Sequence, residues 1–243
     1  MATPRTLLRP LLHGPTFRAP QRRTFLPNPF QSALNPLNTS SSPQTLTATR
    51  TLPYPAAPIY SIVSDVSSYS FFLPYCQSSS VTRWSARDNT YGRSWPSEAK
   101  LTVGWGNLTE SFTSRVFCVP GKIVESIGGS TETDLPANDI SHHLEGSRDQ
   151  DKSAKGAANG LMTHLRSRWT IESVGKNKTE VSLALEFTFA NPLYTTLSAG
   201  AAPKVAHVMI RAFEERVQKL LDGNPEMTKA SLGELEGSQL RQR

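Results

Sequence analysis

The chain has 243 residues, with 26 Lys or Arg against 20 Asp or Glu, and it carries a formal charge of +6. Six arginines but no Lys, Asp or Glu lie within residues 1–64, and the first acidic residue is Asp65. Without these six arginines the chain holds 20 basic and 20 acidic residues, so the net charge resides in the first stretch. The balanced remainder argues against a basic domain and predicts no nucleic-acid partner.

The first 25 residues have the composition of an organellar transit peptide, rich in Arg, Thr, Pro and Leu and free of acids. Arg22-Arg23-Thr24-Phe25 resembles a matrix-processing site, so we expect a mitochondrial transit peptide at residues 1–25. The alternative is a basic tail that binds nucleic acid or anionic lipid. Residues 26–44 are rich in Asn, Pro, Ser and Thr and lack periodicity, which predicts a disordered linker.

Membrane-spanning, disulfide and metal-binding patterns are missing from the sequence. No apolar run approaches the roughly 20 residues of a spanning helix, so any membrane contact is expected to be peripheral. Cys76 and Cys118 lack CxxC spacing, which favours buried apolar positions over a disulfide scaffold or a zinc site. The histidines have no metal-ligand spacing, and no metal is expected.

Alternation of apolar and polar residues predicts strands through most of residues 45–223, which we take as one domain. The clearest alternation is at 180–189, where Val181, Leu183 and Leu185 lie on one face. Residues 97–105 and 108–119 alternate about a Gly106-Asn107 turn and predict a hairpin. The other predicted strands are 45–52, 77–86, 122–127 and 161–174.

Helical periodicity predicts two short segments after the first strand and one long helix near the end. The first short segment follows Pro58, and the second begins at Ser67. The long helix is predicted at 203–221, with Gly223 as a left-handed cap. Its predicted apolar stripe consists of Val205, Val208, Met209, Ala212, Phe213, Val217, Leu220 and Leu221.

Two further segments have little apolar content. Residues 128–160 are mostly Gly, Ser, Asp, Asn, Lys and Ala, which predicts a flexible surface insertion, and the polar residues 224–243 predict a disordered tail. The order of elements predicts an α+β helix-grip fold, in which a curved antiparallel sheet of about seven strands wraps around the long helix. Between sheet and helix such a fold has either a packed core or a ligand cavity.

The stretch from Ile59 to Cys76, IYSIVSDVSSYSFFLPYC, resembles the first helices of the coenzyme Q-binding protein family of the START-like, polyketide-cyclase-like superfamily. Residues 99–104 and 110–114 resemble the central hairpin of the family, and the resemblance extends over residues 46–221. The insertion at 128–160 is longer than in the family. The family's V-x-D-V-x-x-Y-x-x-F-L-P-x-C-type motif is matched by Val63, Asp65, Val66, Tyr69, Phe72, Leu73, Pro74 and Cys76.

The resemblance implies a protein without enzymatic activity or cofactor that binds coenzyme Q (ubiquinone) or its late biosynthetic intermediates in the helix-grip cavity. As a lipid chaperone or carrier it would support respiratory electron transport and quinone biosynthesis. It would lie on the matrix side of the mitochondrial inner membrane as a peripheral protein. Its partners would be the quinone biosynthetic complex or the respiratory complexes.

An apolar quinone tail requires a largely aliphatic and aromatic site. Simple core packing is the alternative role for such inward residues. Glu110 is the candidate polar contact to the headgroup or else caps a strand end, whereas Asp65 is expected at a helix end rather than as a catalytic acid. The candidate lining residues are Leu73, Val103, Trp105, Phe112, Phe187, Tyr194, Met209 and Phe213.

Two other functions are compatible with a helix-grip fold. A cyclase or hydrolase would need an inward titratable group with a perturbed pKa, and the predicted inward stripes hold almost none. A ribosome-associating protein would need a basic patch, which the charge balance of the domain does not favour.

Overall fold

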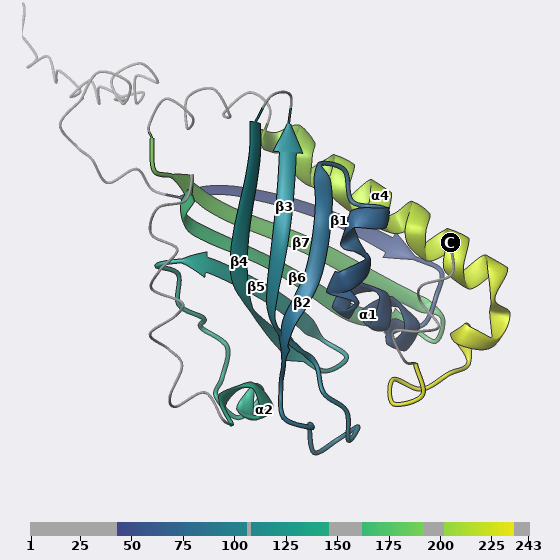
Figure 1. Ribbon diagram of the computed structural model, residues 1–243. Coiled ribbons are helices and arrows are strands. Elements are labelled where there is room, and N and C mark those ends of the chain that lie inside the picture. Colours follow the sequence, from purple (N-terminus) through teal and green to yellow (C-terminus); the bar gives the residue numbers. More distant parts are fainter. Residues whose placement is uncertain (1–42, 106–107, 146–161, 192–201, 236–243) are drawn as a thin grey trace, which may run out of the picture. The chain divides into compact units, whose positions relative to one another are not determined.

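The computed structural model describes residues 43–105, 108–145, 162–191 and 202–235. Its strands form one seven-stranded antiparallel sheet, and its longest helix lies near the C-terminal end of the described residues (Figure 1). The strands are β1 (Gln44–Leu52), β2 (Cys76–Trp84), β3 (Pro96–Trp105), β4 (Leu108–Val119), β5 (Ile123–Gly129), β6 (Met162–Gly175) and β7 (Lys178–Phe189). The helices are α1 (Ala56–Ser64), η2 (Val66–Phe71), α2 (Ser141–Leu144), α4 (Ala202–Gly223) and η4 (Pro225–Thr228).

The sheet has the order β1-β7-β6-β5-β4-β3-β2, so the first strand pairs with the last. Strands β2 to β7 follow one another as a meander. Strand β1 lies at the edge beside β7, where Leu46 pairs with Leu185 and Ala48 pairs with Leu183. The two short helices, α1 and η2, follow β1 as expected. The predicted α+β helix-grip architecture is therefore confirmed, while the predicted Gly106-Asn107 turn lies outside the described residues.

Helix α4 packs against the face of the sheet that we call the inner face, which carries Ala48, Val116 and Trp169. The ring of Phe213 lies 4.9 Å from that of Trp169, and Arg50 of β1 pairs with Glu214 at 3.2 Å. The buried side of α4 consists of Ala206, Ile210, Phe213, Val217, Leu220 and Leu221.

Two details of α4 differ from the prediction. Val208 is 42% exposed, because at 100° per residue it lies about 200° around the axis from Ala206. Gly223 has no left-handed backbone; the helix ends instead where the Asn224 side chain donates to the carbonyl of Leu220 at 3.0 Å.

The opposite, outer face of β4 and β5 is covered by residues 130–145. Ile140 and Leu135 pack on Phe117 and Ile127 and form a second core. The prediction of a flexible surface insertion is therefore wrong for the described residues 128–145, because a few apolar side chains placed over an apolar sheet face are enough to bury the segment. Residues 146–160 lie outside the described residues.

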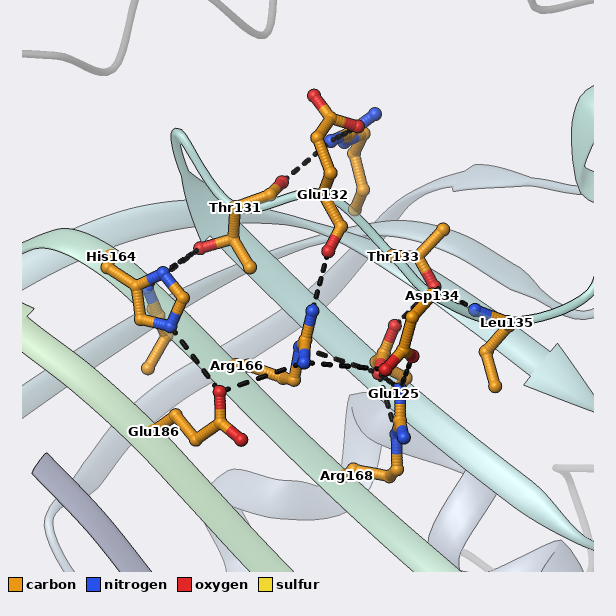
Figure 2. A network of polar contacts seen from close by, with 12 residues as sticks. Glu125, Thr131, Glu132, Thr133, Asp134, Leu135, His164, Arg166, Arg168 and Glu186 are labelled. Carbon is orange, nitrogen blue, oxygen red and sulfur yellow. Dashed lines mark hydrogen bonds and ion pairs between the residues drawn. The ribbon is translucent and has the colours of Figure 1, made fainter. Parts of the chain in front are cut away.

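Figure 2 shows the ion-pair network that holds this segment to the sheet. Glu125 of β5 has 0% of its surface exposed and accepts a hydrogen bond from Nε of Arg168 at 2.7 Å. Arg168 also contacts Asp134, and Thr133 donates to Glu125 at 2.5 Å. Arg166 lies 3.8 Å from the same carboxylate. Two strand arginines thus bind both a sheet carboxylate and a carboxylate of the covering segment.

The C-terminal residues 225–235 are also packed, so the predicted disordered tail at 224–243 is wrong for its described part. Leu235 is 0% exposed, and Met227 and Leu232 are buried. Arg93 donates to the carbonyl oxygens of Leu232 at 2.8 Å and Leu235 at 2.6 Å. A polar segment is held here by three apolar side chains and an arginine from a distant loop, which local composition does not reveal.

We expect Leu235→Ala to lower the free energy of unfolding by about 2–4 kcal/mol, because it removes buried methyl groups and leaves a cavity. Leu144→Ala is the matched control, since Leu144 is largely exposed and its loss should cost below about 0.5 kcal/mol. Denaturant unfolding of both variants measures the difference. Equal stability of the two variants would contradict the packed position of the tail.

Glu125→Gln should lower the free energy of unfolding by about 1.5–3 kcal/mol, because the arginines lose hydrogen bonds to a charged, buried acceptor. Glu132→Gln makes the same chemical change at an exposed side chain that contacts Arg115, and we expect below about 0.5 kcal/mol. Urea unfolding of the two variants would refute the anchoring role if their midpoints moved equally.

Candidate functional site

The inner face of the sheet divides into a packed and an open region. The packed region lies under α1 and α4 and includes Val116, Val124 and Trp169, which are all buried. Farther toward one end of the sheet the inner-face apolar side chains are only partly buried, although their strands each pair with a strand on both sides. We call these the open region: Leu101, Val103, Phe112, Leu165 and Phe187.

Strand register explains why these side chains lie on one face. Leu101 pairs with Phe112 across β3 and β4, and Leu165 pairs with Phe187 across β6 and β7. Directly opposed residues of antiparallel strands point to the same side of a sheet. Two hairpins far apart in sequence thus contribute apolar side chains to one surface, with β5 between them.

The predicted lining residues fall into three groups. Val103, Phe112 and Phe187 lie in the open region, and Met209 is a partly buried residue of α4 that packs against the core. Leu73 and Phe213 are buried in the core, where the ring of Phe213 contacts both Trp169 and Phe72. Tyr194 and the side chain of Trp105 lie outside the described residues.

Glu110 lies on the inner face, because its register partner is Val103. It is partly buried and stands one pair beyond Phe112 toward the end of the hairpin. Among the inner-face strand positions that the structure describes, Glu110 is the one carboxylate. A single carboxylate at the rim of an apolar surface suits a hydrogen-bonding contact and lacks the second titratable group of an acid–base pair.

Small polar residues interrupt the inner face between the packed and open regions, and the sequence analysis did not single them out. Ser126 pairs with Val116 on one side and with Ser167 on the other. Ser114 lies on β4, and Gly128 follows Ser126 by two residues on β5; a Cβ at Gly128 would lie 3.6 Å from the Ser114 hydroxyl. Serines at inward positions of otherwise apolar alternating strands are the signal that could have identified them.

The motif from Val63 to Cys76 is largely structural. Asp65 lies between α1 and η2 and accepts a hydrogen bond from Ser68, so its predicted role at a helix end is confirmed. Tyr69 donates to the carbonyl of Val63 at 2.6 Å. Arg216 of α4 is buried over the Phe72 ring at 5.9 Å; burial lowers its pKa, and the Asp65 carboxylate opposes that shift. The motif thus binds the short helices to α4.

The connection from η2 to β2 presents apolar side chains to solvent. Phe71 is 67% exposed and Tyr75 is partly exposed. Tyr75 has a left-handed backbone with a φ of 67°, and its carbonyl accepts a hydrogen bond from the N–H of Gly104 at 2.9 Å. This corner is therefore fixed next to β3, on the strand that contributes Val103 and Leu101 to the open region.

The two adjacent histidines of α2 are buried, contrary to their expected place in a flexible insertion. Nε2 of His143 accepts a hydrogen bond from the backbone N–H of Cys118 at 2.9 Å, and its Nδ1 lies 3.1 Å from the Ser97 hydroxyl. Burial, assisted by neighbouring His142, lowers the pKa of His143 to about 3. Burial also raises the pKa of the Cys118 thiol to about 12. At neutral pH these groups are uncharged and serve packing; Cys76, by contrast, is only half-buried.

The described residues contain no cluster of three His, Cys, Asp or Glu arranged to hold a metal ion. None of the helices in this part of the chain is long and apolar enough to cross a membrane.

Comparison with known proteins gives the family. Residues 52–214 match the family model described as polyketide cyclase / dehydrase and lipid transport. The chain belongs to this family. The matched region begins at the end of β1 and ends within α4, so the polyketide cyclase / dehydrase and lipid transport domain is the sheet and helix described above.

The proteins similar to this chain carry different names. The mitochondrial coenzyme Q-binding protein of Schizosaccharomyces pombe is 28% identical over 171 residues, which cover 70% of this chain and 85% of that protein. The ribosome association toxin RatA of Pseudomonas aeruginosa is 29% identical and covers 70% of this chain and 92% of its own. A START superfamily protein from Mycobacterium smegmatis gives a TM-score of 0.49 at 20% identity, over 72% of this chain and 98% of its own. The predicted resemblance to the coenzyme Q-binding proteins is confirmed.

The burial of His143 predicts that the stability of the protein decreases at acidic pH. The pKa of His143 is about 3 in the folded protein, compared with an ordinary value of 6.5 in the unfolded chain. Between these two pH values the unfolded chain therefore binds a proton that the folded protein does not. The contribution of His143 to the free energy of unfolding is therefore fully present above about pH 6.5. It falls on acidification by about 1.4 kcal/mol per pH unit, which amounts to about 2 kcal/mol at pH 5.

His143→Gln should remove this part of the pH dependence, so that its unfolding free energy changes less between pH 7 and pH 5 than that of the unmodified chain. His207→Gln alters an exposed histidine of α4 and should leave the slope unchanged. Urea unfolding at several pH values provides the measurement, and equal slopes for all three proteins would contradict the assignment.

Proposed function

We propose that this protein binds coenzyme Q (ubiquinone), or a late intermediate of its biosynthesis, on the open region of the inner face. The observation that carries the proposal is the row of partly exposed apolar side chains on one end of the inner face, whose other end is packed. A relative that is named a coenzyme Q-binding protein supports the choice of ligand. The protein acts as a lipid chaperone or carrier that supports respiratory electron transport and quinone biosynthesis.

The chemistry of the open region matches a polyprenyl quinone. Its described side chains are aliphatic or aromatic, as an isoprenoid tail requires. Burial of apolar surface contributes about 25 cal/mol per Å², so several isoprene units give useful affinity without a charged anchor. Glu110 at the rim and the serines on the floor supply polar contacts for a headgroup.

The proposed location is the matrix side of the mitochondrial inner membrane. The acid-free, arginine-containing first stretch supports import, as does the mitochondrial name of the relative. Exposed Phe71 and Tyr75 supply apolar side chains for peripheral membrane contact. The protein would deliver its lipid there to the quinone biosynthetic complex or to respiratory complexes.

Ribosome association is the second candidate function, and the similarity to RatA favours it. Against it, the chain after its first stretch has equal numbers of acidic and basic residues. The arginines Arg166 and Arg168 are also paired with carboxylates rather than displayed to a polyanion. Enzymatic cyclisation or hydrolysis has less support, because the inner-face strand positions in the described ranges hold one carboxylate and no histidine.

The direct test is to purify the full chain without detergent and to analyse its organic extract by ultraviolet spectroscopy and mass spectrometry. The proposal predicts a polyprenyl benzoquinone at near-stoichiometric amount. A folded protein that carries no lipid and does not take up added quinone would refute it. Co-sedimentation of that protein with ribosomes would then support the second candidate.

Phe112→Asp should abolish lipid retention, because it places a charge in the open region while leaving the packed core intact. Thr113→Asp is the control, since the adjacent side chain of β4 is exposed on the outer face. Both variants should show the same circular dichroism, and only the first should lose its extractable quinone. Retention by the Phe112 variant would show that the lipid binds elsewhere.

A further inference from the structure

Three serine hydroxyls lie together on the inner face, at the border of the packed and open regions. Ser126 of β5 is the register partner of Ser167 of β6 and, on its other side, of Val116 of β4. Ser114 lies two residues before Val116, so it shares that face. Antiparallel neighbours in register bring these hydroxyls to the floor of the sheet, on three adjacent strands.

The hydroxyl of Ser114 lacks a hydrogen-bond partner. The residue is 1% exposed, and its Oγ has no donor or acceptor within reach. Buried polar side chains are paired in the great majority of cases, so an orphaned hydroxyl indicates a group that something else satisfies. Its register partner on β3, Ala99, is buried on the same face and offers no polar side-chain atom to this hydroxyl.

The serines on the two neighbouring strands are less buried than this hydroxyl. Ser126 and Ser167 remain partly exposed, although Val124 and Trp169, two residues away on the same face, are buried. Gly128 contributes no side chain; a Cβ there would lie 3.6 Å from the Ser114 hydroxyl and 3.7 Å from Leu165 Cβ. Gly128 thus separates the enclosed Ser114 hydroxyl from Leu165, the first apolar residue of the open region.

We propose that Ser114, with Ser126 and Ser167, forms the hydrogen-bonding site for the headgroup of the bound lipid. This inference rests on the proposed function and places the ring at the inner end of the open region, with its tail along Leu165, Phe112 and Phe187. The headgroup class is a ring that carries carbonyl or methoxy oxygens, because hydroxyl donors require acceptors. Gly128 keeps any side chain out of the path between that ring and the Ser114 hydroxyl.

Two probes separate headgroup recognition from tail binding. The first is a short-tailed ubiquinone, and the second has the same isoprenoid tail on a hydrocarbon ring without oxygen. Ser114→Ala should weaken binding of the quinone about five- to tenfold and leave the hydrocarbon probe unchanged, because one neutral hydrogen bond is lost. The carbonyl stretching frequency of the bound quinone should rise in this variant, which a merely structural change would not produce.

Gly128→Ala provides a second variant that should fold normally, since the added methyl meets its neighbours at ordinary contact distances of 3.6–3.8 Å. It fills the space beside the Ser114 hydroxyl and should also reduce quinone binding selectively. The controls are Ser111→Ala, whose exposed hydroxyl bonds Thr102 at 2.8 Å, and Gly175→Ala at the end of β6, where the nearest atom is 3.5 Å away. Thermal unfolding verifies that each variant is folded.

The outcomes distinguish the two proposals. If the unmodified full chain binds both probes and the Ser114 and Gly128 variants keep its preference for the quinone within twofold, the headgroup site is refuted and the carrier function stands. If the unmodified chain binds neither probe, the proposed function itself fails, and the headgroup site fails with it. Selective loss of quinone binding in both variants, with unchanged controls, supports the headgroup site.

Discussion

The contact between Phe213 of α4 and Trp169 of β6 sets the position of the long helix over the sheet. The two rings lie 4.9 Å apart in the core, and Phe72 joins them from η2 at 6.5 Å from Phe213. Large aromatic rings bury much surface and tolerate little displacement in a close-packed interior. The helix is therefore fixed above β1, β6 and β7 at this depth, and the inner face beyond it is left with partly exposed apolar side chains.

Residues 130–145 cover the outer face of β4 and β5 and so support the strands of the open region from the other side. On the outer face Phe117 and Ile127 pack under Ile140, and Glu125 binds Arg168 within the same layer. A buried carboxylate is stable only when its charge is compensated, so the network specifies one arrangement of residues 130–145 over β5 and β6. The inner-face serines thus lie on strands whose outer face is packed against this segment.

The chemical character of the site agrees with binding rather than catalysis. The buried histidine that hydrogen-bonds Cys118 lies away from the open region and has a pKa near 3, so it remains neutral at physiological pH. The strand positions described in the open region offer hydroxyls and one carboxylate among apolar side chains. This combination suits the weakly polar ring and the apolar tail of the quinone ligand that we propose.

Periodicity within the sequence was sufficient to predict the seven strands, the two short helices and the long helix. Apolar residues such as Val181, Leu183 and Leu185 alternate with polar ones, and this alternation indicates which face of the strand is buried. It also placed Val103, Phe112 and Phe187 on the correct face. The predictions of a flexible insertion and a disordered tail were wrong for residues 130–145 and 225–235. These segments are mostly polar, and their few apolar side chains, such as Ile140 and Leu235, are buried by parts of the chain that are distant in sequence. Tertiary structure alone decided which inward residues are packed, as Phe213 is, and which stay partly exposed, as Phe112 does. That distinction depends on where α4 stops covering the sheet, and no local pattern encodes the distance between a helix and a strand.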